Sequence, residues 1–132
     1  MMVCLLDDEL YGNFKNRCKK AWCIEEVMFL RAVLEFQTIS STYGLSKQSA
    51  DKAKEICETH ILQGAVLEIN LDMAIVENIN FKVKENSFEV EIFDEAFNSV
   101  SQTLRHGVFR EWSSEPNFNG LIDAAAAAIT MA

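Results

Sequence analysis

The chain has 132 residues, 49% of them apolar and 24% charged, which suits one domain with a single hydrophobic core. Its formal net charge of −8 argues against nucleic acid and anionic membrane surfaces as partners, because both attract clustered Lys and Arg. No apolar run approaches the roughly 20 residues that span a bilayer, and the acidic start is unlike a signal peptide. We therefore expect a cytoplasmic protein that does not insert into membranes.

Residues 24–39 predict a helix that is buried on most of its sides. In the segment IEEVMFLRAVLEFQTI, few residues after Glu26 interrupt the apolar positions, chiefly Arg31, Glu35 and Gln37. A helix that is apolar nearly all round lies at the centre of a bundle. We expect the other helices to pack around this one.

Two further segments space their apolar residues as helices do. The segment 46–62 begins at Ser46, a favourable N-cap residue, and the segment 93–104 ends before a cationic last turn and a glycine. Short helices are also expected at 108–114 and near Pro116, and an Ala-rich terminal helix at 123–132. The apolar stripes are Ala50, Ala53, Cys57 and Ile61 in the first segment, and Phe93, Ala96, Phe97, Val100 and Leu104 in the second.

The segment FKVKENSFEVEIF, residues 81–93, is compatible with two structures. Its strict alternation of apolar and polar residues fits a β-hairpin that turns near residues 85–87. A helix from Asp72 competes for the first half, because Ile75, Val76, Ile79 and Val83 also follow a period of 3.6. An isolated hairpin is only marginally stable. We favour a helix to about residue 80 or beyond, with the hairpin as the alternative.

Taken in order, several motifs resemble the RGS domain, the regulator of G-protein signalling. The resemblance covers roughly residues 5–122, and EINLD followed by FDEA is its most specific part. It implies an all-α, RGS-like bundle of about nine helices that forms a single domain over 1–132. The motifs are LL at 5–6, YGNF at 11–14, EEVMFLRAVLEF at 25–36, EINLD at 68–72, FDEAFNSV at 93–100 and FREWSSEPNFNGL at 109–121.

The resemblance implies that three loops at one end of the bundle bind the switch regions of a Gα subunit. Asn70 stands where the family has an Asn that projects towards Gα and the glutamine that orients the hydrolytic water. From spacing alone, Asn70 would more simply bond its own loop backbone, as Asn does in turns. Asp72 is expected to cap the following helix. The implied Gα-binding residues are Cys23, Glu25, Glu26, Glu68, Asn70, Asp72, Gly107, Val108, Arg110 and Glu111.

Two of these loops depart from the family's pattern. Glu25-Glu26 stands where the family usually has Glu-Asn. In the third loop the family has an Asp, then a Ser, and an Arg four residues after the Asp. This chain has Gly107, Val108 and Glu111 there, and Arg110 would point about 100° away on a helix. These differences put GTPase activation in doubt but leave the expected fold unchanged.

Two functions are left open by these observations. One is a regulator that binds activated Gα and can accelerate its GTP hydrolysis, with no nucleophile of its own, because Gα already carries the catalytic groups. The alternative is a non-activating RGS-homology scaffold or adaptor within a larger signalling protein. In either case we expect a monomer without cofactor, recruited to the inner face of the plasma membrane by its partner.

The cysteines and histidines do not have the spacing of a metal site. Neither a C-x-x-C pair nor a regular ligand spacing to a histidine is present. We therefore predict no metal site and reduced thiols, some of them in the core. Both histidines are expected on the surface, at helix ends. The residues concerned are Cys4, Cys18, Cys23, Cys57, His60 and His106.

Overall fold

A computed structural model describes residues 1–122, and the Ala-rich helix expected at 123–132 lies outside them. Within residues 1–122 the chain is helical and has no strand, which confirms the all-α prediction. A π-helical segment, η1, continues α4, a 3-10 segment, η2, precedes α6, and residues 118–122 are again helical. The elements are α1 (Met2–Leu6), α2 (Asp8–Lys20), α3 (Ile24–Tyr43), α4 (Lys47–Ile56), η1 (Cys57–Ile61), α5 (Met73–Lys84), η2 (Val90–Phe93), α6 (Asp94–His106) and α7 (Val108–Ser113).

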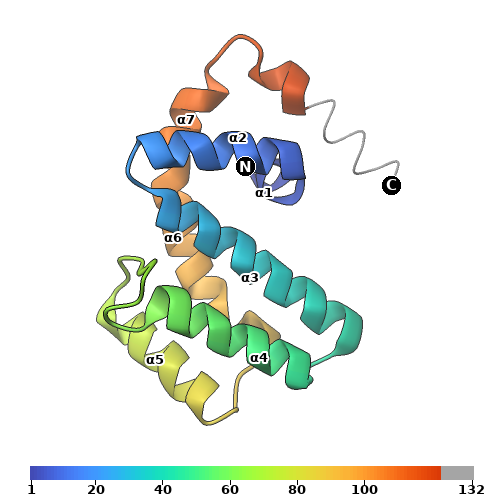
Figure 1. Ribbon diagram of the computed structural model, residues 1–132, viewed down its shortest axis with the longest axis vertical. Helices are drawn as coiled ribbons and strands as arrows, with labels where there is room; N and C mark the ends of the chain where they lie inside the picture. The colour runs from blue at the N-terminus through green and yellow to red at the C-terminus, as the bar shows by residue number, and fades with distance from the viewer. Residues whose placement is uncertain (123–132) are drawn as a thin grey trace.

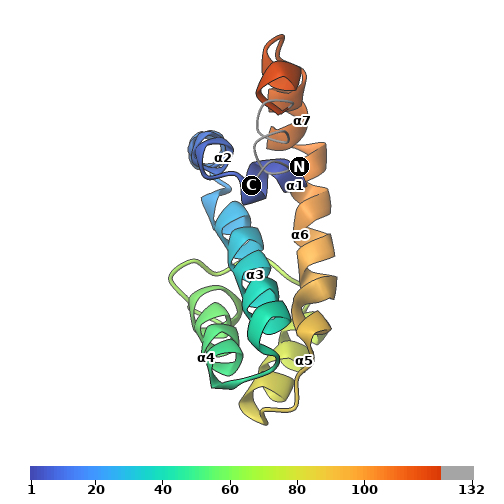
Figure 2. The ribbon, with the colours of Figure 1, turned by 90° about the vertical axis from the view of Figure 1, so that its right-hand side faces the viewer.

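Helix α3 is the central helix, as its sequence predicts (Figure 1). It packs against α1, α2, α4 and α6. Figure 2 shows α6 running beside α3 and leading on into α7. The helix continues one turn beyond the predicted end, to Tyr43. Its fully buried residues are Val27, Phe29, Leu30, Val33 and Phe36.

Aromatic side chains form two separate clusters, and each cluster packs helices together in its own part of the molecule. In one cluster, Phe93 meets Phe36 edge-on at a centroid distance of 5.3 Å and links η2 to α3. Near α7, the Phe14 ring of α2 stacks on Trp112 at 5.6 Å. The guanidinium of Arg17 lies over the same indole, 5.3 Å from its centroid, and donates hydrogen bonds to the Glu115 carboxylate. These contacts fasten α2 to α7.

The hairpin alternative for residues 81–93 is wrong. Helix α5 continues to Lys84, and residues 90–93 form a 3-10 turn. Ile79 and Val83, four residues apart, are buried on the inner face of α5, whereas Phe81 is 66% exposed on its outer face. The alternation of apolar and polar residues at 81–84 therefore arises because Phe81 lies on the exposed face of α5 and Val83 on its buried face. The predicted caps are present: Asp72 Oδ1 accepts from the Ala74 amide at 3.3 Å, and Ser46 is the N-cap of α4.

The thiols are free and mostly internal, as predicted. Cys4, Cys18 and Cys57 are buried, and burial raises the pKa of Cys57 to about 12. His106 is exposed, but the surface prediction for His60 is wrong, because its side chain is only 4% exposed. In the part of the chain that the structure describes, no helix combines the length and apolarity needed to cross a bilayer, and no three potential metal ligands gather.

Candidate functional site

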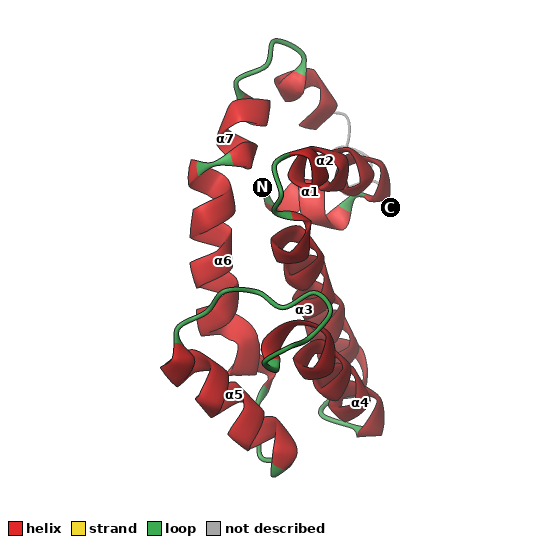
Figure 3. Cartoon of the chain, turned by 60° about the vertical axis from the view of Figure 1, so that its left-hand side comes forward, coloured by secondary structure: helices red, strands yellow, loops and turns green. Residues whose placement is uncertain are grey.

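The three predicted loops lie on one side of the molecule, at the left of Figure 1. They are the connection 21–23 between α2 and α3, the loop 62–72 between η1 and α5, and Gly107 between α6 and α7. Figure 3, which turns this side forward, shows the 62–72 loop passing in front of α3 and α6. Residues separated by up to 88 positions in the sequence, from Cys23 to Glu111, are thus placed on the same side by the helix ends that carry them.

The first loop is a tight turn that leads directly into α3. The Cys23 amide donates to the Cys18 carbonyl at 2.8 Å, and Cys23 is the N-cap residue of α3. Glu25 and Glu26 follow in the first turn and are both partly buried. Burial raises the pKa of the Glu26 carboxyl, opposed by its own backbone amide and assisted by the neighbouring Glu25. Glu26 Oε2 has no hydrogen-bond partner within residues 1–122. The carboxylate that replaces the expected Asn is therefore drawn inwards, at an electrostatic cost.

The second loop is fixed to the π-helical segment by its backbone. The Leu67 amide donates to the Thr59 carbonyl at 3.1 Å, and the Ile69 amide donates to the His60 carbonyl at 2.9 Å. The Ile69 side chain is buried next to these bonds. Asn70 follows immediately, so its position is set by an anchored neighbour on one side. On the other side, Asp72 is the N-cap residue of α5.

Asn70 is exposed, and its side chain makes no hydrogen bond to any residue from 1 to 122. The interpretation in which it only bonds its own loop is therefore not what the structure shows. Glu68 has that local role instead, because its Oε1 accepts from the Gly64 amide at 2.9 Å. Gly64 has φ of +83°, a conformation that glycine adopts without a steric penalty. The amide of Asn70 is thus presented to solvent and available to a partner.

The third loop consists of a single residue between two helices. A Cβ added at Gly107 would lie 3.2 Å from the Thr103 carbonyl oxygen, so the neighbouring backbone favours glycine. Val108 is half-buried against the core, whereas Arg110 and Glu111 are exposed. Neither of the two charged side chains forms an ion pair within residues 1–122. The Asp–Arg pair that the resemblance implied has no counterpart at this surface.

Exposed apolar side chains beside these loops were not predicted from the sequence. Trp22 lies at the tip of the first loop, is 92% exposed and has φ of +61°. Val66 is 86% exposed in the second loop, and Met73 at the start of α5 is also exposed. Large exposed aromatic residues are enriched where proteins bind one another. The signal in the sequence was a Trp in the short segment before the predicted helix at 24–39, close to Lys19 and Lys20.

The ten predicted residues are mostly acidic, since they include five carboxylates and one cation, Arg110. Exposed cations flank them, with Lys19 and Lys20 before the first loop and Arg105 before the third. The carboxylates favour basic groups on a partner opposite their own positions.

Comparison with known proteins gives two matches. The family model described as "Regulator of G protein signaling domain" matches residues 4–121. The chain is also 29% identical, over 82 residues, to "Regulator of G-protein signaling rgs-3" of Caenorhabditis elegans. That match covers 62% of this chain and 22% of the nematode protein, so the chain spans about a fifth of that relative's length.

Proposed function

The chain belongs to the regulator of G protein signaling domain family, and from that membership we propose that it binds an activated Gα subunit and accelerates its GTP hydrolysis. The contact surface is the side formed by the loops 21–23 and 62–72 and by the α6–α7 junction at Gly107. The observation that carries the proposal is the exposed amide of Asn70, which bonds to no residue from 1 to 122, on an anchored loop that lies on the same side as the other two.

The proposed mechanism is stabilisation of Gα in its transition-state arrangement. Gα supplies the arginine and the glutamine that act on the γ-phosphate and on the attacking water. A partner that binds the switch segments more tightly in that arrangement lowers the barrier by the difference in binding energy. The Asn70 amide can both donate and accept hydrogen bonds, so it can fix the position of the glutamine side chain. The domain itself contributes no nucleophile.

The acidic residues of the surface favour a Gα whose switch surface is basic. Glu26 and Glu111 stand where the family has an amide and a guanidinium. With a Gα that carries acidic groups opposite these positions, both would repel it and weaken binding. With basic groups there, they would form ion pairs. Trp22 is the proposed apolar anchor of the same contact, because of its size and exposure.

The test of the surface is the variant Asn70→Ala. It should weaken binding to the GDP–aluminium fluoride form of Gα by roughly five- to a hundredfold, since one buried hydrogen-bonding group typically contributes about 1–3 kcal/mol. The melting temperature should hardly change, because Asn70 lies outside the core. Lys47→Ala, on the exposed start of α4 far from the three loops, is the control and should bind like the wild type. Equal affinity of Asn70→Ala and the wild type would place the contact elsewhere.

A second measurement separates an activating domain from one that only binds. Single-turnover GTP hydrolysis by Gα is followed with and without the domain. We expect a faster rate in its presence, and Asn70→Ala should lose most of that acceleration. Tight binding without any acceleration would instead indicate the non-activating scaffold.

A further inference from the structure

We propose that His60 is a positioning residue, which holds the 62–72 loop so that Asn70 is presented to the partner. The proposal deepens the proposed function and rests on it, because the loop matters to Gα only if Asn70 contacts Gα. His60 is only 4% exposed, so it lies behind the loop and does not itself face a partner. It acts through the backbone of Leu67 and Ile69.

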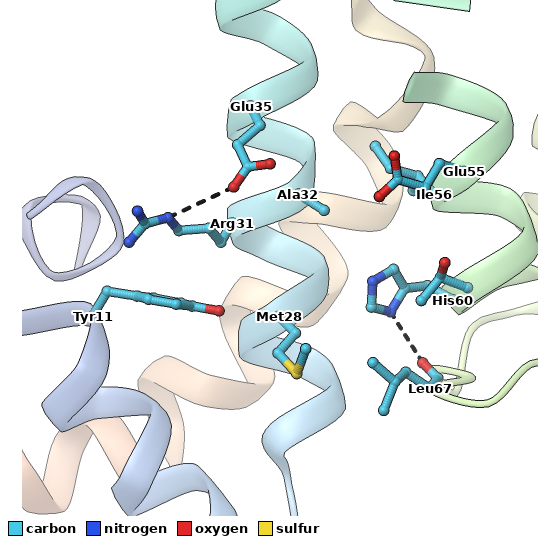
Figure 4. Close-up of a pocket in the computed structure, with 10 residues that line it drawn as sticks. Tyr11, Met28, Arg31, Ala32, Glu35, Glu55, Ile56, His60 and Leu67 are labelled. Carbon is cyan, nitrogen blue, oxygen red and sulfur yellow. Dashed lines mark hydrogen bonds and ion pairs between the residues drawn. The ribbon is translucent and has the colours of Figure 1, made fainter. Parts of the chain in front are cut away.

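His60 holds the loop through two groups, its ring and its carbonyl oxygen. Nδ1 of the ring lies 3.1 Å from the Leu67 carbonyl oxygen, and the His60 carbonyl accepts from the Ile69 amide at 2.9 Å. Figure 4 shows the ring between α3 and α4, with Leu67 directly below it. Because a carbonyl can only accept, Nδ1 carries the proton and donates. Leu67 is bound at both of its backbone groups, since its amide also donates to Thr59.

The π-helical segment makes these carbonyls available. Its closing bond runs from the Leu62 amide to the Cys57 carbonyl at 2.9 Å, five residues back. The last carbonyls of any helix lack partners within the helix. Here the Thr59 and His60 carbonyls receive the returning loop instead, so the end of the helix and the Asn70 loop form one hydrogen-bonded unit. π-helical turns occur frequently at functional sites.

The burial of His60 requires a compensating bond. His60 is only 4% exposed, and its ring meets Phe29 edge-on at a centroid distance of 5.6 Å. A buried polar ring is unfavourable unless it is hydrogen-bonded. The Leu67 bond supplies this compensation. Its other nitrogen faces a cavity of about 310 Å³ that is lined by Tyr11, Met28 and Ala32 among others, as Figure 4 shows.

Two pairs of variants test the proposal. His60→Phe keeps a ring against Phe29 but loses the donor. His60→Asn is the conservative variant, because its side-chain amide nitrogen can take the place of Nδ1. His60→Gln is its matched control, since its longer side chain carries the amide past the Leu67 carbonyl. Met28→Leu, which lines the same cavity and makes no bond to the loop, controls for disturbed packing.

The first measurement uses the free protein. We expect hydrogen exchange of the Leu67 and Ile69 amides to become about fivefold faster, or more, in His60→Phe and His60→Gln, while His60→Asn and Met28→Leu stay near the wild type. Unchanged exchange in His60→Phe would overturn the proposal. Should His60→Phe fail to fold, the Asn and Gln pair decides the outcome, because only one of them keeps the donor.

The second measurement is affinity for the GDP–aluminium fluoride form of Gα. His60→Phe should bind about fivefold more weakly and His60→Asn within about twofold of the wild type. In an Asn70→Ala background, His60→Phe should cause no further loss, because residues that act through one another are not additive. The same loss in both backgrounds would overturn the positioning role. If the wild type fails to bind any Gα, the proposed function fails, and amide exchange alone then decides whether His60 holds the loop.

Discussion

At the scale of single residues, the proposed contact surface differs from the family's pattern at the α6–α7 junction, where Gly107 and Glu111 replace an Asp and an Arg. Gly107 leaves no side chain where the family has an Asp, and the nearby Thr103 carbonyl crowds any Cβ placed there. Glu111 is exposed one turn further along, without an ion pair within residues 1–122. Glu111 stands in the first turn of α7, where its only expected stabilising role is with the helix dipole. Under the proposed function, its charge faces the partner.

Changing this charge should change partner preference. We expect Glu111→Arg to raise affinity for a conventional Gα by about three- to tenfold, with little change in melting temperature, because charge pairs at the edge of a contact are only modestly stabilising. The gain should be partial, since no Asp at position 107 orders the new arginine. Glu85→Arg makes the same charge change at the far end of α5 and should leave affinity unaltered (Figure 1). An equal gain in both variants would mean that net charge, and not this junction, determines binding.

At the scale of elements, patterns that depend on neighbouring residues were predictable and contacts between distant segments were not. The central position of α3 and the Asp72 cap follow from local apolar spacing and local side-chain chemistry. The end of α5 at Lys84 agrees with a helix to about residue 80 or beyond, but the sequence could not define it more closely, because the exposed Phe81 imitates a strand pattern. Nothing in the sequence near His60 indicates that its ring meets a carbonyl seven residues later across a loop. Asn70 was found only through the family resemblance, and Trp22 was missed because exposure depends on the turn that carries it.

The two sides of α3 should respond differently to a buried charge. Val33 is fully buried between helices, and we expect Val33→Asp to cost more than about 4 kcal/mol and to prevent folding. Leu34 is half-buried and borders an open groove between α1 and α3, so Leu34→Asp should cost only about 1–2 kcal/mol. Circular dichroism during thermal unfolding measures both. A Val33→Asp protein that melts like the wild type would contradict the central position of α3.

At the scale of the whole molecule, two buried titratable groups influence stability in opposite directions. Burial lowers the pKa of His60 from its ordinary 6.5, while the Leu67 carbonyl partly offsets this. The unfolded chain then binds a proton more readily than the folded one, so stability falls as the pH drops through 6.5 and towards the lowered pKa. The pKa of Glu26 is raised above its ordinary 4.5, so protonation of Glu26 favours the folded state at lower pH. Comparing two proteins that both retain Glu26 cancels its contribution.

The unfolding free energy of the wild type and of His60→Phe should therefore diverge with pH. Around pH 7.5 the difference is set by packing and by the lost Leu67 bond. As the pH falls below about 6.5, the wild type should lose stability relative to the variant, because only the wild type has an imidazole that binds a proton more readily in the unfolded chain. Denaturant unfolding at several pH values measures this difference. The titratable groups around the ring are present in both proteins, so their own titration does not make the two curves diverge. These groups are Tyr11 on α2, Arg31 and Glu35 on α3, and Lys52 and Glu55 on α4. Parallel curves would show that His60 titrates alike in the folded and unfolded chains, and hence that its ring is not enclosed as described.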